Sequence, residues 1–312
     1  MEKERFKLKT REKKKVSVDV YHPEGEPLAA LQVLHGMAET KDRYEDFAQT
    51  LAGRGIVVYV YDHRGHGKSK IDSLPLGLAS VHHSWKTMRD DVLQVTGLIE
   101  ARHPGIPLFL LGHSMGSLLA RDFAGKEGTH LAGLILSGTA ANPGLKGLLG
   151  QWLSGFLVLV QGSTKISPLL DRLLFGRAND FLEKPRTRFD WLTRDETLVD
   201  KYIQDPLCGY ICPAGFYHEL IKGTRRAWRK EAFARTPGDL PIYVFGGGKD
   251  PIGNFGQAVV DTAERYRSAG VRDVVQKVYP EGRHEMLNEL NRQDVYRDVA
   301  IWMEEKMRNW KG

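Results

Sequence analysis

The first half of the chain alternates short apolar runs with longer amphipathic stretches. Runs of β-branched and aromatic residues are typical of buried strands, whereas apolar residues spaced three and four apart are typical of helices. The runs that predict strands are residues 16–21, 30–36, 56–62, 107–113 and 131–138. The stretches that predict helices between them are residues 43–55, 85–105 and 117–128. This alternation indicates an α/β fold with a mainly parallel sheet and helices on both faces.

The alternation stops after residue 138 and resumes near residue 238. Between residues 139 and 237 no strand-like run occurs, and this segment is rich in aromatic residues, so we expect it to be helical or irregular. The resumed pattern predicts strands at residues 240–247 and 273–280 and helices at residues 255–270 and 293–310. One core domain, formed by residues 1–138 and 238–312 and interrupted by an insertion at 139–237, fits this pattern better than two tandem domains.

Basic residues are concentrated at the start of the chain. The first 15 residues hold eight Lys and Arg and three Glu, and so carry most of the formal net charge of +6. Because the rest of the chain is almost neutral, a broad nucleic-acid-binding groove is not expected. In RFKLKT, residues 5–10, apolar and basic residues alternate, which predicts a half-buried edge strand whose lysines discourage edge-to-edge pairing. Attraction of this segment to an anionic membrane surface stays open as an alternative.

Two features bear on the compartment. Residues 1–15 lack the apolar core of a signal peptide, and the chain has only two cysteines, Cys208 and Cys212, too few for a disulfide framework. We interpret them as small buried residues, with a disulfide or metal pair as the alternative, and expect a cytoplasmic protein. Residues 148–160 form the most apolar stretch, which is shorter than the about 20 residues that span a bilayer and predicts a buried or interfacial helix. Nothing in the sequence indicates the oligomeric state.

One short motif suggests nucleophilic chemistry. Ser114 lies between glycines in GHSMG, residues 112–116, after a strand-like run and before a helix-like one. A Gly-x-Ser-x-Gly turn in this context holds the serine hydroxyl above the carboxyl end of a sheet, where helix N–H groups favour a developing oxyanion. We therefore predict that Ser114 is a nucleophile and not merely a small residue at a turn.

A serine nucleophile needs a base and an acid, which in a sheet of this type follow it in the order acid, then histidine. Asp250 follows a strand-like run in GGGKDPIG, residues 246–253. His284 is the only histidine after Asp250, and it follows the last strand-like run. We predict that His284 takes the proton of Ser114 and returns it to the leaving alcohol, while Asp250 orients the imidazole.

A tetrahedral intermediate needs two hydrogen-bond donors. We expect one to be the N–H of Met115, directly after the nucleophile, and the other to be the N–H of Met37 in HGMAE, after an early strand. Gly36 lets that loop approach the site, and we expect His35 to brace it. YDHRGHGKS, residues 61–69, could be taken for a metal site, but its histidines lack metal-like spacing, and we interpret it as a loop beside the pocket.

Five motifs together resemble the monoacylglycerol lipase and bacterial lysophospholipase branch of the α/β-hydrolase superfamily. The motifs, in that family's order between residues 34 and 291, are LHGMAE, YDHRGHGKS, GHSMGS, GGGKDPIG and GRHEMLNE. Residues 186–210 are similar to bacterial members labelled lysophospholipase. The resemblance implies an eight-stranded, mostly parallel sheet with the insertion as a helical cap, and no cofactor or metal. The residues that it assigns to the triad and the oxyanion hole are Ser114, Asp250, His284, Met37 and Met115.

The leading hypothesis is therefore a serine ester hydrolase that cleaves single-chain lipid esters, monoacylglycerols or lysophospholipids, through an acyl-enzyme. A soluble carboxylesterase or thioesterase with the same triad is the alternative, and a non-catalytic ligand-binding protein on this fold is a remote one. Epoxide and haloalkane hydrolysis are disfavoured because they use a carboxylate nucleophile where this chain has Ser114. Many relatives carry a histidine where this chain has Thr40, so properties tied to that histidine are not carried over.

Overall fold

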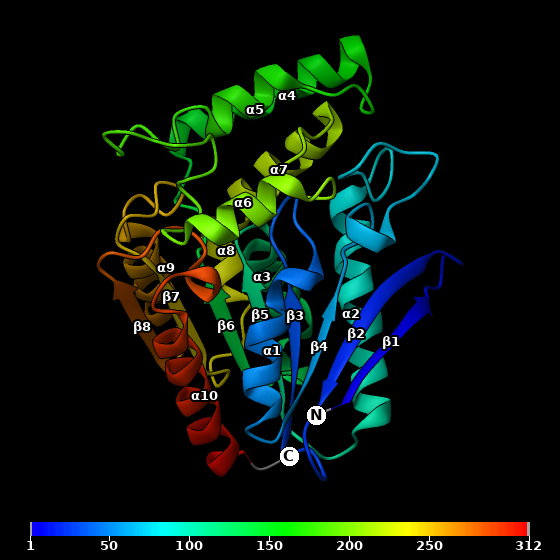
Figure 1. Cartoon of the computed structure of the whole chain (residues 1–312), viewed down its shortest axis with the longest axis vertical. Coiled ribbons are helices and arrows are strands. Elements are labelled where there is room, and N and C mark those ends of the chain that lie inside the picture. Colours follow the sequence, from blue (N-terminus) through cyan, green and yellow to red (C-terminus); the bar gives the residue numbers. More distant parts are fainter. Residues whose placement is uncertain (1, 311–312) are drawn as a thin grey trace.

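An eight-stranded sheet forms the centre of the molecule (Figure 1). The computed structural model describes residues 2–310. The strands are β1 (Glu2–Lys9), β2 (Lys15–His22), β3 (Ala29–Leu34), β4 (Ile56–Tyr61), β5 (Leu108–His113), β6 (Gly133–Ser137), β7 (Ile242–Gly247) and β8 (Val274–Tyr279). They follow the order β1-β2-β4-β3-β5-β6-β7-β8, in which β2 is antiparallel to both of its neighbours and the other pairs are parallel. The predicted α/β fold with a mostly parallel, eight-stranded sheet is confirmed.

The central strands are apolar at nearly every position because both faces of the sheet are covered. In β4, Val57 and Tyr59 belong to the core on one face, whereas Val58 and Val60 belong to the core on the other. Successive side chains of a strand point to opposite faces, so a strand buried on both sides needs a continuous apolar run. This requirement explains why the strands were readable as runs rather than as alternating patterns.

Helices on the two faces enclose these cores. The helices α2 (Ser84–Arg102), α3 (Met115–Glu127) and α9 (Gln257–Ser268) contribute to one core, and α1 (Glu45–Ala52) and α10 (Arg292–Asn309) contribute to the other. The stretch at residues 43–55, predicted as one helix, is divided into a 3-10 turn, η1 (Lys41–Tyr44), and α1. The helix predicted from residue 255 begins at Gln257, because Asn254, Phe255 and Gly256 have positive φ.

Five helices lie between β6 and β7, and we call this part of the chain the inserted segment. They are α4 (Gly144–Gln161), α5 (Pro168–Phe175), α6 (Glu196–Gln204), α7 (Ala214–Ala227) and α8 (Lys230–Ala234). No strand occurs in this described part of the chain, apart from an isolated bridge between Ile166 and Pro213. In Figure 1, α4 and α5 form the outermost layer, above α6 and α7, and the sheet lies below them.

Helix α4 distinguishes between two alternatives that the sequence left open. It contains the most apolar stretch of the chain, yet only Gly147, Ser154 and Leu157 of its residues are buried. The helix packs on α7 by one side, and its other side is exposed, with Trp152 74 % and Leu159 83 % accessible to solvent. Of the two alternatives predicted from the sequence, a buried or an interfacial helix, α4 is not the buried one. No helix among residues 2–310 is both long and apolar enough to cross a membrane.

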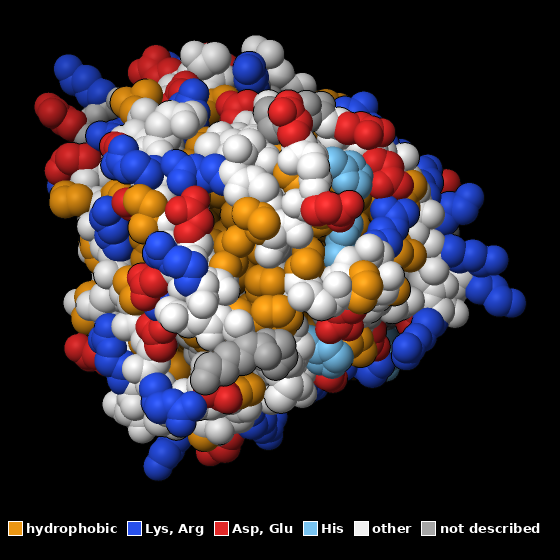
Figure 2. All heavy atoms as spheres, turned by 90° about the horizontal axis from the view of Figure 1, so that it is seen from below, with side chains coloured by type: hydrophobic (Ala, Val, Ile, Leu, Met, Phe, Trp, Pro, Cys, Tyr) orange, Lys and Arg blue, Asp and Glu red, His pale blue; other side chains and the backbone are white. Residues whose placement is uncertain are grey.

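The strand predicted at the N-terminal edge is present as β1. It pairs with β2 along its whole length, and Phe6 and Leu8 pack against the core, whereas Arg5, Lys7 and Lys9 are exposed. Figure 2 views the molecule from below, the side away from α4, and shows basic and acidic side chains interspersed over that face.

Candidate active site

Ser114 occupies a sharp turn between β5, which ends at His113, and α3, which begins at Met115. Its backbone is left-handed, with φ of 52°, an uncommon conformation for a residue other than glycine. A Cβ atom at Gly112 would lie 2.3 Å from the carbonyl oxygen of Gly116, and one at Gly116 would lie 2.2 Å from that of Leu34. Both positions therefore require glycine, and the turn presents the Ser114 side chain at the carboxyl end of the sheet.

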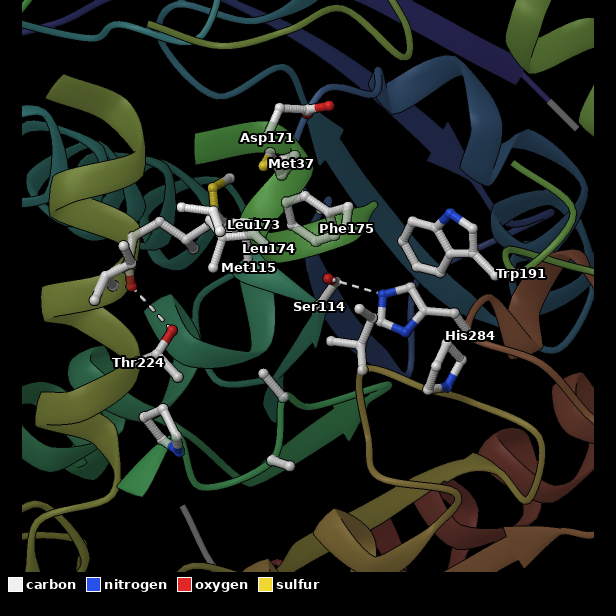
Figure 3. Close-up of a pocket in the computed structure, with 18 of the residues that line it drawn as sticks. Met37, Ser114, Met115, Asp171, Leu173, Leu174, Phe175, Trp191, Thr224 and His284 are labelled. Atoms are coloured by element: carbon white, nitrogen blue, oxygen red, sulfur yellow. Dashed lines mark hydrogen bonds between the residues drawn. The ribbon is translucent and has the colours of Figure 1, made fainter. Parts of the chain in front are cut away.

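Loops that follow the last two strands bring two further side chains to Ser114. The Oγ atom of Ser114 lies 2.9 Å from Nε2 of His284, and Nδ1 of the same ring lies 3.0 Å from Oδ1 of Asp250. The dashed line between Ser114 and His284 in Figure 3 marks the first of these contacts. Asp250 and His284 are each only 2 % exposed, and Oδ1 of Asp250 also accepts a hydrogen bond from the N–H of Ile252. The three predicted residues thus form one continuous hydrogen-bonded chain.

The surroundings of His284 control its charge. Burial opposes the charged imidazolium, but the carboxylate of Asp250, through its charge and its hydrogen bond, outweighs burial and raises the pKa of His284 above its ordinary value. The ring of His113 lies 4.9 Å from the ring of His284. Burial first, and then the charge of His284, lower the pKa of His113 to about 3, so that His113 is neutral beside His284.

Two backbone amides remain available next to Ser114. The N–H of Gly36 is occupied because it donates to the carboxylate of Glu39, whereas within residues 2–310 no hydrogen-bond acceptor is found for the N–H of Met37. Met115 is the first residue of α3, where amides have no partner inside the helix. The neighbouring Ala38 has φ of 51°, so this loop, residues 36–39, is held in a strained form.

A cavity of about 1410 Å³ opens above Ser114 and His284. It exceeds the volume of pockets for drug-sized ligands, which is typically about 300–1,000 Å³. Figure 3 shows Met37, Met115, Leu173, Leu174 and Phe175 around Ser114. Much of the remaining apolar wall comes from α4 and α7, through Leu145, Leu149, Leu153, Leu220 and Ile221. An extended apolar group therefore has room beside the serine.

Comparison with known proteins identifies the family of this chain. A family model described as serine aminopeptidase, S33, matches residues 25–291. The chain belongs to this family. It is 30 % identical to the monoacylglycerol lipase of Mycolicibacterium smegmatis, across 93 % of this chain and 92 % of that protein. It is 29 % identical to the monoglyceride lipase of Homo sapiens, across 92 % of this chain and 86 % of that protein.

A solved structure agrees with the sequence relatives. The carboxyl esterase from Bacillus coagulans, in complex with glycerol, superimposes with a TM-score of 0.91 at 26 % identity and covers 98 % of this chain and 99 % of that one. The resemblance inferred from the five motifs is confirmed, and the chain is a serine ester hydrolase with the α/β-hydrolase fold.

In this hydrolase the inserted segment supplies a residue that the sequence analysis did not single out. The ring of Trp191 lies 5.1 Å from that of His284 and stacks on Phe175, as Figure 3 shows. The carbonyls of Trp191 and Leu192 accept hydrogen bonds from the N–H groups of His284 and Glu285. Aromatic content alone could not have identified Trp191, because the inserted segment contains many aromatic residues.

Residues that follow Trp191 extend this attachment to the histidine loop. Oγ1 of Thr193 donates to the carbonyl of Asn288, and the guanidinium of Arg194 pairs with the fully buried carboxylate of Glu289. The part of the inserted segment around residues 190–195 is thus joined to the loop that carries His284.

The motif at residues 61–69 forms a buried loop behind the site. Nε2 of His35 accepts a hydrogen bond from the N–H of His63, and Nδ1 of His35 donates to the carbonyl of Gly36. His35 therefore links this loop to the loop that carries Met37. Among residues 2–310, no group of three or more histidine, cysteine or acidic side chains is arranged to hold a metal ion. Cys208 and Cys212 are buried free thiols, as expected.

Proposed function

We propose that Ser114, His284 and Asp250 are the nucleophile, the base and the orienting acid of this ester hydrolase. The observation that carries the proposal is the chain of two hydrogen bonds, 2.9 Å and 3.0 Å long, that ends at the wall of an apolar cavity. His284 removes the proton of Ser114 as Oγ attacks the acyl carbon, and it then protonates the leaving alcohol. A water molecule, activated by the same imidazole, then hydrolyses the acyl-enzyme.

The N–H groups of Met37 and Met115 serve as the oxyanion hole in this proposal. Both lie on backbone that is fixed before the reaction, so they need little rearrangement when the negative charge develops. The amino end of α3, which begins at Met115, adds a partial positive charge to the same place. Loss of one such donor typically costs about 10²–10³ in kcat.

For the substrate we propose a monoacylglycerol. The long apolar cavity suits an acyl chain, and the relatives named above include monoacylglycerol lipases. The wall beside the oxyanion and histidine loops contains the carboxylates of Glu39 and Glu285, which share one cation, Arg43. The rest of the lining contributes Asp171 and the cations Lys146, Arg172 and Arg188, so the cavity has no net positive charge to attract the phosphate of a lysophospholipid and suits an uncharged alcohol such as glycerol.

Two experiments test this function. A fluorophosphonate probe should label the wild-type protein and fail to label Ser114→Ala; a folded wild type that resists labelling would contradict the triad. Turnover of monoacylglycerols of graded chain length should exceed that of lysophosphatidylcholines with matched acyl chains. Equal rates on short, water-soluble esters and on long-chain monoacylglycerols would favour a carboxylesterase instead.

We further propose that the inserted segment, residues 139–237, is a cap whose outer helix makes transient contact with a lipid surface. The exposed side of α4 carries Trp152, Phe156 and Leu159, and the helix contains no acidic residue and one lysine, Lys146. An amphipathic helix with an apolar face and no negative charge suits the interface of an anionic bilayer. The two free thiols agree with a reducing cytoplasm as the compartment.

A further inference from the structure

A buried cation connects the two loops of the proposed site. The guanidinium of Arg43, in η1, donates to Oε2 of Glu39 at 2.7 Å and to both carboxylate oxygens of Glu285 at 2.5 Å. The side chain of Arg43 is 12 % exposed, and those of Glu39 and Glu285 are 3 % and 4 % exposed. Glu285 lies 242 residues further along the chain. One side chain thus ties together two loops that are distant in sequence.

The first of these loops carries the proposed oxyanion donor. The second oxygen of Glu39, Oε1, accepts from the N–H of Gly36 and from the hydroxyl of Tyr44, the latter at 2.9 Å. The occupied amide of Gly36 fixes the orientation of the next peptide, which contains the N–H of Met37. The position of Met37 therefore depends on Glu39, whose other oxygen is held by Arg43.

The second loop carries the proposed base. Glu285 directly follows His284, and its own N–H donates to the carbonyl of Leu192 at 2.7 Å. Because the bidentate contact from Arg43 fixes the Glu285 side chain, it also restricts the backbone on which the imidazole is mounted. Neither Glu39 nor Glu285 could be exchanged for a neutral residue without loosening one of the two loops.

The inserted segment completes this arrangement. The guanidinium carbon of Arg43 lies 4.7 Å from the ring centre of Tyr202 in α6, which is a cation–π contact. The hydroxyl of Tyr202 donates to the carbonyl of Ala38 at 3.0 Å, and the N–H of Gly209 donates to the same carbonyl at 2.9 Å. The strained loop at residues 36–39 is thereby held at one end by Glu39 and at the other by the inserted segment.

We propose that Arg43 is a positioning residue that sets the placement of the Met37 amide relative to His284, and that Tyr202 makes this placement depend on the inserted segment. The inference rests on the proposed roles of Ser114, His284 and Met37. Arg43 does not line the cavity, so its loss should lower kcat and leave KM nearly unchanged. If a substitution outside the cavity displaces a reacting group by about 1 Å, the rate can fall about 10²-fold.

The test uses the full-length protein and p-nitrophenyl butyrate, which reports acyl transfer without requiring a lipid substrate. Arg43→Lys keeps the charge and loses the fork that contacts both carboxylates. We expect its kcat to fall about 10–100-fold, with KM within about 3-fold of wild type. The matched control is Arg102→Lys at the end of α2, because Arg102 contacts both carboxylate oxygens of Glu4 and lies over the ring of Phe6 at the β1 edge of the sheet. The control should keep kcat.

Two further variants keep the inference testable if an Arg43 single variant does not fold. Arg43→Gln leaves two buried carboxylates without their cation, which is strongly destabilising, and adding Glu285→Gln removes one of them. The double variant should fold and show the same loss of kcat as Arg43→Lys or a greater one. Tyr202→Phe keeps the ring beneath the guanidinium and removes only the bond to Ala38, so we expect a smaller loss, about 3–10-fold, in line with one neutral hydrogen bond.

The outcomes separate this inference from the proposed function. If the wild type does not hydrolyse the ester, or if Ser114→Ala hydrolyses it equally well, the proposed function is wrong. If hydrolysis depends on Ser114 but folded Arg43→Lys keeps its kcat, or Arg102→Lys loses as much, the positioning role is wrong. A wild-type kcat in Tyr202→Phe would overturn the part assigned to the inserted segment.

Discussion

Removing the aromatic side chains from the outer side of α4 should weaken binding to lipid vesicles. Trp152 and Phe156 are four residues apart and so lie on one side of the helix, with 74 % and 60 % of their surfaces exposed. With about 200 Å² for each side chain, the exposed parts amount to roughly 270 Å². At about 25 cal/mol per Å², transfer of half of this area into a bilayer contributes about 3 kcal/mol. The double variant Trp152→Ala/Phe156→Ala should therefore bind about 100-fold more weakly.

Flotation with vesicles of phosphatidylcholine and phosphatidylglycerol measures this partition. Neither aromatic residue lines the cavity, so hydrolysis of p-nitrophenyl butyrate should stay at the wild-type rate. The matched control is Leu28→Ala/Ile301→Ala, which removes two exposed apolar side chains outside the inserted segment, 61 % and 50 % accessible. Equal partition of the α4 variant and the wild type would refute the reasoning, as would an equal loss in the control.

Two further predictions concern the site. In the wild type, kcat/KM should rise with pH through a midpoint above 6.5, because the active base is neutral and the carboxylate of Asp250 raises the pKa of His284. Asp250→Asn removes the largest influence that raises this pKa and leaves the smaller ones of Glu285 and Glu39 to oppose burial, so the midpoint should fall and the plateau should fall about 10⁴-fold; an unmoved midpoint would contradict this cause. Gly116→Ala should cost about 1–3 kcal/mol and abolish labelling of the serine, since the new Cβ would meet Leu34 at 2.2 Å. Gly97→Ala in α2, where nothing lies within 4 Å, should instead stabilise by about 0.5–1 kcal/mol in a thermal melt, and equal effects would refute the steric explanation.

The sequence predicted the centre of the sheet well because the central strands are buried on both faces. A run such as residues 56–62 must be apolar throughout, and few other structures require this. The chain order of Ser114, Asp250 and His284 was also readable, since each follows a strand run and the downstream histidine has no competitor. Their hydrogen bonds could not be read from the sequence, because contacts across 170 and 34 residues depend on how the loops pack.

Other features depend on tertiary packing and left no readable signal. The apolar composition of α4 left a buried and an interfacial helix open, because burial is decided by whether a second surface is present, and α4 packs on one side only. Arg43 lies at the start of an ordinary amphipathic stretch, where an arginine is normally solvated. Only the fold shows that Glu285, far along the chain, forms a hydrogen-bonded ion pair with Arg43.

The attachment of residues 190–195 to the histidine loop has a consequence for protein engineering. A chimaera that exchanged the whole inserted segment for that of a relative would also exchange the carbonyls of Trp191 and Leu192, on which the backbone of His284 and Glu285 rests. The exchangeable module should therefore stop before Asp190. Within it, α4 and α5 can be varied to alter the acyl-chain preference, while the segment after them is retained with the core.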